Sequence, residues 1–157
     1  MRNVLKLAAA SALPMLAVAL TAGPAAADPQ HFDPARVQGT TPGCAGTANA
    51  EVSASQGQQA REFADFIDSS ARVMVNFQPD ANPLSSLSAQ SCEIATTVTL
   101  RNLDTGASST ETRTTQYDGH YGWHAAFFTL PGSGRVAVTV STNPNPAEVV
   151  IEVPAPY

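Results

Sequence analysis

The chain has 157 residues, which is enough for one domain and leaves little for a second. With 43% hydrophobic and only 13% charged residues, its composition excludes a largely disordered charged chain, and its 12 prolines and 10 glycines favour short elements separated by many turns. The net charge of −5 argues against nucleic acid as a partner, because binding to phosphates needs clustered Lys and Arg side chains.

Residues 1–27 have the features of a secretory signal peptide. Arg2 and Lys6 precede an apolar run over residues 7–20, and the small residues Ala25, Ala26 and Ala27 follow it. The run is shorter than the roughly 20 residues that a transmembrane helix needs. We therefore expect cleavage after Ala27 and a secreted chain without a membrane span, with an uncleaved anchor as the alternative.

Removal of this segment leaves a more acidic chain. Arg2 and Lys6 leave with it, so six basic residues, all arginines, remain against 13 acidic ones, a net charge of −7. The arginines are scattered, which also disfavours docking to an anionic membrane surface. The lack of lysine beside abundant alanine is typical of a high-GC bacterial genome.

Residues 28–46 are polar and rich in Pro and Gly, so we expect a flexible N-terminal arm ahead of a domain over residues 47–157. Cys44 and Cys92 are the only cysteines, and in an exported chain such a pair predicts one disulfide. This disulfide is expected to join the first strand region to the start of the third. Two free thiols, as metal ligands or nucleophile, are the alternative.

From residue 48 onward, apolar residues recur with a period of two, which predicts β-strands. The run 71–77, for example, places Ala71, Val73, Val75 and Phe77 on one face. Residues 59–70 fit a short helix or an irregular strand equally, since Phe63 and Ile67 match both spacings. The strands expected in chain order are 48–53, 71–77, 92–102, 108–116, 122–130, 134–142 and 147–153.

Turn signals separate these strands. Residues 102–106 form a predicted hairpin turn in which Gly106 supplies a positive φ. The returning strand 108–116 is rich in Thr and Ser, which suits an exposed sheet edge. Proline- and glycine-rich turns at residues 131–134 and 143–146 divide the last three strands.

Seven strands at a spacing of about ten residues predict an all-β fold, an immunoglobulin-like β-sandwich with one disulfide. The resemblance is one of architecture, because the antibody order of Cys, Trp and Cys is replaced here by Cys44, Cys92 and Trp123. Such sandwiches carry binding, structural and enzymatic roles, so the fold class does not supply the function.

Residues 117–124 concentrate chemically active side chains. They hold the only tryptophan, two of the three tyrosines and two of the three histidines. The segment lies between two predicted strands, where a loop at one end of the sandwich is expected, and such loops commonly carry function. The candidate binding residues are Tyr117, Asp118, His120, Tyr121, Trp123 and His124.

Three interpretations of this segment remain open. In the first, Trp123 and one tyrosine cap the hydrophobic core and the histidines face solvent. In the second, the aromatic side chains form a recognition surface, which Phe127 would extend. In the third, His120 and His124 bind copper or zinc, with Asp118 or His31 completing the site.

The metal interpretation draws on a short resemblance. Asp118-Gly119-His120 resembles a stretch of the small periplasmic copper-resistance sandwich proteins. In those proteins the stretch stands just before the final strand, whereas two predicted strands follow it here.

Catalysis is the least supported class. The chain contains no Gly-x-Ser-x-Gly sequence, no His-Glu-x-x-His sequence and no phosphate-binding glycine loop. We therefore expect a secreted, non-catalytic binding or envelope-associated structural module without a cofactor. Its partner would be an unknown protein or glycan at the cell surface. A copper- or zinc-binding protein and a secreted hydrolase are the alternatives.

Overall fold

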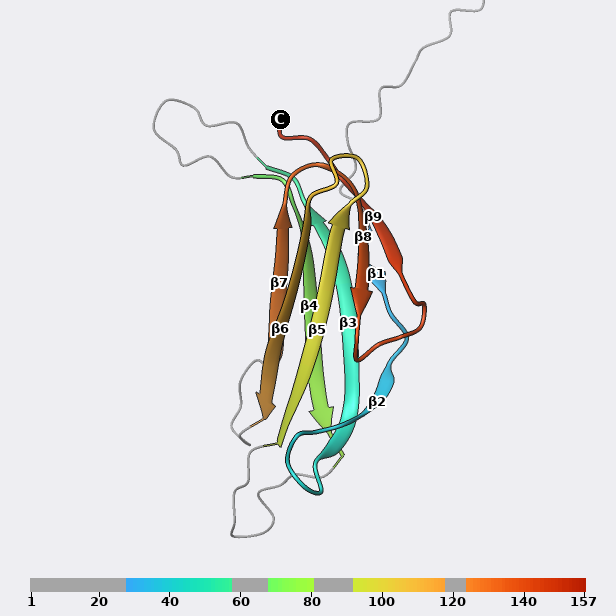
Figure 1. The fold of residues 1–157 in the computed structure, drawn as a ribbon, viewed down its shortest axis with the longest axis vertical. Helices are drawn as coiled ribbons and strands as arrows, with labels where there is room; N and C mark the ends of the chain where they lie inside the picture. The colour runs from blue at the N-terminus through green and yellow to red at the C-terminus, as the bar shows by residue number, and fades with distance from the viewer. Residues whose placement is uncertain (1–27, 58–67, 81–91, 118–123) are drawn as a thin grey trace, which may run out of the picture.

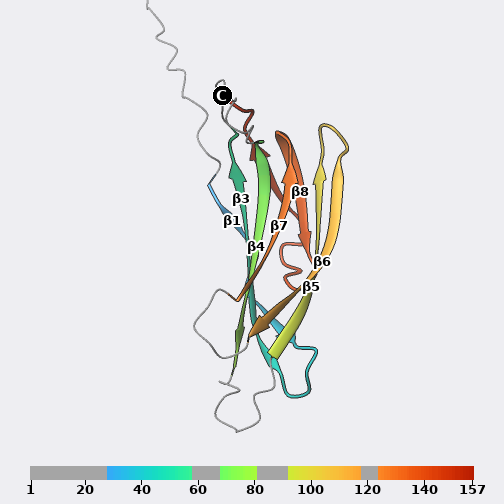
Figure 2. The same ribbon diagram turned by 90° about the vertical axis from the view of Figure 1, so that its left-hand side faces the viewer.

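A computed structural model describes residues 28–57, 68–80, 92–117 and 124–157, which form two antiparallel sheets packed face to face (Figure 1). The first sheet contains β1 (Gln30–His31), β2 (Ala35–Gln38), β3 (Ala45–Ser55), β4 (Ser70–Pro79) and β7 (Ala125–Pro131). The second contains β6 (Ser108–Tyr117), β5 (Cys92–Asn102), β8 (Gly134–Val140) and β9 (Val149–Val153). Figure 2 shows the layers from the side, with β3 and β4 opposite β5 and β6. The predicted all-β sandwich with one disulfide is confirmed.

Alternation along the strands builds the core between the sheets. On β4, Val73, Val75 and Phe77 are at most 3% exposed, whereas Arg72 between the buried positions faces solvent. β-Branched and aromatic side chains suit such a half-buried pleated surface. Strands β5, β8 and β9 bury their own Val, Ile and Leu side chains against this face. The predicted division of faces on 71–77 is therefore confirmed.

Strand pairing follows the immunoglobulin-like order. β4 pairs with β7, β5 with β8, and β8 with β9, which are the B–E, C–F and F–G neighbours of such a sandwich. β3 takes the first position beside β4, and β6 extends the second sheet beside β5. As a result β4 and β6 end, and β3, β5 and β7 begin, at one end of the sandwich (Figure 1).

The segment predicted as a flexible arm pairs with β3 in the structure. Between the pairs His31–Glu51 and Ala35–Ala48, three residues face two residues of β3, so the segment forms a β-bulge. Pro34 stands in this bulge, where its missing N–H breaks no ladder hydrogen bond. Phe32 is 3% exposed in the core, and its N–H donates to the carbonyl of Ala50 at 3.0 Å. Burial of Phe32 holds the segment despite its prolines.

Strand boundaries differ modestly from those predicted. β3 runs over Ala45–Ser55, longer than the expected 48–53, because β2 and β4 pair with it on both sides. The ambiguous stretch 59–70 lies outside the described residues up to residue 67, and β4 begins at Ser70. Within the described ranges there is no helix long and apolar enough to span a membrane.

Two buried asparagines organise the turns. The Asn102 carboxamide oxygen accepts the N–H groups of Asp104 and Thr105, each at 3.0 Å, and its amide donates to the Ser133 carbonyl at 2.9 Å. The Asn143 amide donates to the carbonyls of Asp33 and Ala48. Burial removes water from both side chains, and these direct hydrogen bonds replace the hydrogen bonds that water would form.

Candidate functional site

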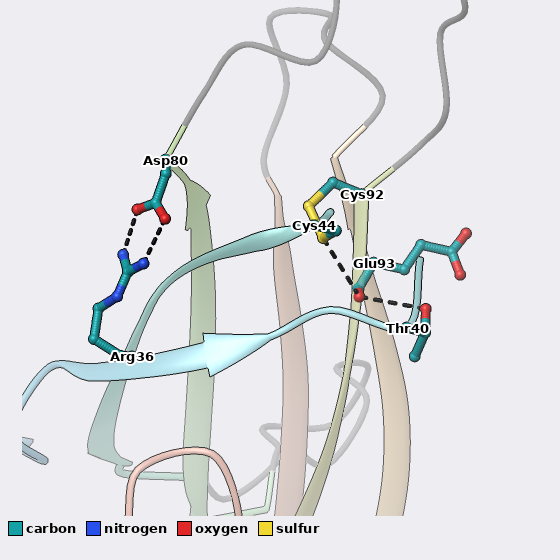
Figure 3. The surroundings of a disulfide bond; sticks show 6 residues. All are labelled: Arg36, Thr40, Cys44, Asp80, Cys92 and Glu93. Atoms are coloured by element: carbon teal, nitrogen blue, oxygen red, sulfur yellow. Dashed lines mark hydrogen bonds and ion pairs between the residues drawn. A yellow bond between two sulfur atoms is a disulfide. The ribbon is translucent and has the colours of Figure 1, made fainter. Parts of the chain in front are cut away.

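A disulfide joins the two sheets at one end of the sandwich (Figure 3). Cys44 lies just before β3 in the first sheet, and Cys92 is the first residue of β5 in the second. The predicted pairing of the two cysteines is confirmed, and it connects the first and third long strands as expected. We call this end of the sandwich, which also carries Tyr117 and His124, the disulfide end.

Backbone hydrogen bonds reinforce the connection. The N–H of Thr40 donates to the carbonyl of Glu93 in the opposite sheet at 2.8 Å, and the N–H of Gly39 donates to the carbonyl of Cys44 at 2.8 Å. The Thr40 hydroxyl also donates to the Glu93 carbonyl, at 3.4 Å (Figure 3). Gly39 allows this close approach, because a Cβ at its position would lie 2.1 Å from the Cys44 sulfur. The turn over residues 39–44 is thus fixed against both sheets.

A small apolar cluster lies beneath the disulfide, apart from the main core. Its fully buried members are Cys44, Ala48, Phe77, Cys92 and Ile94, and the partly buried Val37 and Tyr117 pack against them. Tyr117 is therefore one wall of this cluster, with its backbone paired to Cys92.

Tyr117 and His124 form the two ends of the candidate segment, and their rings are in contact. The ring centroids are 4.4 Å apart with the planes tilted by 53°. The His124 Nδ1–H donates to the carbonyl of Gln116 at 3.0 Å, because a carbonyl oxygen can only accept. The His124 carbonyl accepts the N–H of Phe77 at 3.2 Å and continues the ladder between β4 and β7.

The other four candidate binding residues, Asp118, His120, Tyr121 and Trp123, lie outside the described residues. The partial burial of Tyr117 fits the core-cap interpretation for that side chain. Phe127 is 51% exposed, whereas its neighbour Phe128 is buried, so β7 presents Phe127 outward as expected.

Among the described residues, no group of three or more His, Cys, Asp or Glu side chains is placed to hold a metal ion. His31 lies on β1, with its Nδ1 3.9 Å from a carboxylate oxygen of Glu51. His120, which the metal interpretation requires, and Asp118, its alternative to His31, are outside the described ranges.

An ion pair at the disulfide end was not predicted. The guanidinium of Arg36 on β2 donates two hydrogen bonds to the carboxylate of Asp80, which follows β4 (Figure 3). These hydrogen bonds hold the pKa of Asp80 below its ordinary value. The N–H of Asp80 also donates to the Ala45 carbonyl at 3.0 Å. The two charges are 44 positions apart, so no local sequence pattern signals the pair.

Comparison with known proteins gives no family to which the chain can be assigned: no family model matches it, and neither a curated protein nor a solved structure does.

Proposed function

We propose that the protein is a secreted, non-catalytic recognition module that contacts a protein or glycan at the cell exterior. Its contact surface would be the disulfide end, with residues 117–124 at the centre. The secretion features of residues 1–27 and the single disulfide support an extracellular location.

The observation that carries the proposal is the anchoring of this segment. Tyr117 is held by the apolar cluster beneath the disulfide, and His124 by the Gln116 carbonyl and by β4. The six residues between them contain the only tryptophan, a tyrosine, a histidine and an aspartate. Aromatic residues with polar tips on a rigid scaffold favour binding, because little conformational freedom is lost on association.

The position of the segment in the fold gives further support. In variable immunoglobulin domains the recognition loops follow strands B, C′ and F at one end of the sandwich. Here the segment follows β6, which occupies the C′ position beside β5. This support is an analogy of architecture, because the same fold carries many functions.

The test compares Trp123→Ala with Val150→Ala, which truncates an exposed apolar residue on β9, at the opposite edge of the second sheet from β6. Each purified protein is immobilised and exposed to solubilised surface material from the producing cell. We expect Trp123→Ala to lose capture of a defined protein or glycan while its circular dichroism and melting temperature stay unchanged. Val150→Ala should retain capture.

Two outcomes count against the proposal. Capture by a folded Trp123→Ala protein at the wild-type level would exclude the tryptophan from the contact surface. Unfolding of Trp123→Ala would support the core-cap interpretation, and Tyr121→Ala then provides the second test. Wild-type capture by a folded Tyr121→Ala protein would overturn the proposal.

A further inference from the structure

The outer face of the first sheet contains a shallow pocket of about 250 Å³, lined by residues from β1, β3, β4 and the bulge. The lining residues that bear on its chemistry are His31, Pro34, Asn49, Glu51, Met74 and Asn76. None of the residues that line the pocket belongs to the 117–124 segment.

Strand register explains why these residues meet. Glu51 on β3 is paired with His31 on β1 and with Met74 on β4, so the three form a row across the sheet. Asn49 and Asn76 are partners in a second row along the same face. The bulge that carries Pro34 forms one wall of the pocket above β3.

The polar groups of the pocket are well suited to hydroxyl ligands. The two carboxamides each offer an N–H₂ donor and an oxygen acceptor, and the Glu51 carboxylate adds acceptors. Across the part of the chain that the structure describes, neither Asn49 nor Asn76 forms a side-chain hydrogen bond. Asn49 is exposed and Asn76 half-buried, so the two amides remain accessible side by side.

An apolar surface adjoins these amides. Met74 is paired with Phe127 on β7, which continues the Glu51–Met74 row to the edge of the sheet. Phe127 is 51% exposed, so much of its ring is accessible on this face. A flat aromatic ring beside hydrogen-bonding groups offers packing and directional contacts together.

From these features we propose that the outer face of the first sheet binds a neutral saccharide. The amides and the carboxylate would hydrogen-bond neighbouring hydroxyls, while Met74 and Phe127 would pack against the C–H face of a sugar ring. Of the residues that the structure describes, no Arg or Lys lines the pocket, so an anionic ligand would lack a permanent counter-charge there. A purely apolar ligand would cover the amides without pairing them, which is unfavourable.

The size of the pocket indicates how the ligand binds. Its volume lies below the roughly 300–1,000 Å³ of sites that enclose whole small molecules. We therefore infer that it receives one or two units of a longer chain, which continues across Met74 toward Phe127.

The experiment titrates ¹⁵N-labelled protein with neutral gluco-, manno-, xylo-, galacto- and chito-oligosaccharides, and with oligogalacturonate as an anionic comparison. We expect one neutral series to shift the side-chain N–H₂ signals of Asn49 and Asn76. The variant Asn76→Ala should raise Kd about tenfold, as loss of a hydrogen bond in a binding site does. Asn76→Asp, which keeps the shape but loses the donors, should also weaken binding.

The control for Phe127→Ala is Val150→Ala on the opposite sheet, because Phe127 and Val150 are 51% and 50% exposed. The saccharide proposal is overturned if no neutral oligosaccharide binds, or if binding survives both Asn76 variants and Phe127→Ala. It is also overturned if sedimentation shows that Phe127 instead joins two copies of the chain.

The test separates this site from the disulfide end. Saccharide binding that is lost in Trp123→Ala but kept in the Asn76 variants would overturn the sheet-face site and support the proposed function. Loss in the Asn76 variants alone would support the sheet-face site without bearing on the disulfide end.

Discussion

Single side chains connect distant turns, and Asp104 is the clearest case. Its carboxylate accepts hydrogen bonds from the Arg135 guanidinium at 2.7 and 3.1 Å and from the Arg135 backbone N–H at 2.8 Å. The Arg135 side chain is the main cause that lowers the pKa of Asp104, and the backbone hydrogen bond adds to it. The β5–β6 turn is thereby linked to the start of β8.

Acid should weaken this link. Because the Asp104 pKa is lower in the folded chain, the group stabilises the fold above its unfolded pKa of about 3.9. That contribution is lost as the pH falls through the folded pKa. We expect the melting temperature of Asp104→Asn to lie below that of wild type at pH 7, with the gap closing in acid. Thermal unfolding followed by circular dichroism across pH measures it.

A direct titration provides the control. Carboxyl NMR signals should give Asp104 a midpoint below about 3.9, and Arg135→Gln should raise it toward that value. Glu111, whose pKa is lowered by Arg113, should titrate identically in both proteins. An unchanged Asp104 midpoint in Arg135→Gln would show that the guanidinium is not the cause.

At the scale of elements, β6 and β7 are edge strands of different sheets and lie next to each other (Figure 1). Arg113 and Glu111 lie on the inner face of β6, beside the buried Thr96 and Val98 of β5, although their side chains at this sheet edge are still 49% and 40% exposed. The Arg113 guanidinium lies 5.4 Å from the centre of the Phe128 ring and donates to Glu111 at 2.7 Å. Inward-facing charges of this kind protect sheet edges from pairing with other chains.

Arg113→Ala should therefore have two effects. Loss of the cation–π contact and of the covering alkyl chain should lower the free energy of unfolding by about 1 kcal/mol in urea titrations. The uncovered edge should also increase light scattering on prolonged incubation. Thr114→Ala, which truncates an exposed β6 residue that faces the other way, is the control. Equal behaviour of the two variants would contradict the protective role.

How far the elements follow from sequence depends on whether their signal is local. The alternation on 71–77 and the hairpin turn at Gly106 are local patterns, and both appear in the structure, where Gly106 has a φ of 78°. β1 and β2 were not predicted, because the segment that contains them is held in place by the burial of Phe32 against strands distant in the sequence. Pro29 and Pro34, which precede the two strands, favour a loop when the sequence is read alone.

The candidate sites also differ in whether a local sequence pattern signals them. The 117–124 segment is visible as a concentration of aromatic and imidazole groups, yet the contact of Tyr117 with His124 depends on how β6 and β7 meet. The Asn49–Asn76 pair gives no sequence signal at all. It depends on the register between β3 and β4, and a shift by one residue would turn one amide inward.

For the whole molecule, the main core and the smaller cluster beneath the disulfide are distinct. The main core spans both sheets with Val, Ile, Leu and Phe side chains, whereas the smaller cluster has few large ones. Stability at the disulfide end therefore relies on the covalent link more than stability at the other end does.

Removing both cysteines tests this dependence. The disulfide closes a separation of 48 residues, and chain entropy predicts that Cys44→Ala/Cys92→Ala lowers the free energy of unfolding by about 4 kcal/mol. Urea unfolding measures the loss, and hydrogen exchange should show the largest gain around Tyr117. Wild type with reductant is the control for the substitutions themselves. A loss below about 1 kcal/mol would show that packing alone holds the two sheets together.

The C-terminal residues occupy the opposite end of the sandwich (Figure 1). The Ala155 carbonyl accepts the side-chain amide of Gln56 at 2.9 Å, and the Tyr157 N–H donates to the Gly57 carbonyl at 3.4 Å. A tether attached at Tyr157 would therefore hold the molecules on a bead or sensor chip with the disulfide end pointing outward. In this orientation the disulfide end would stay accessible to binding partners.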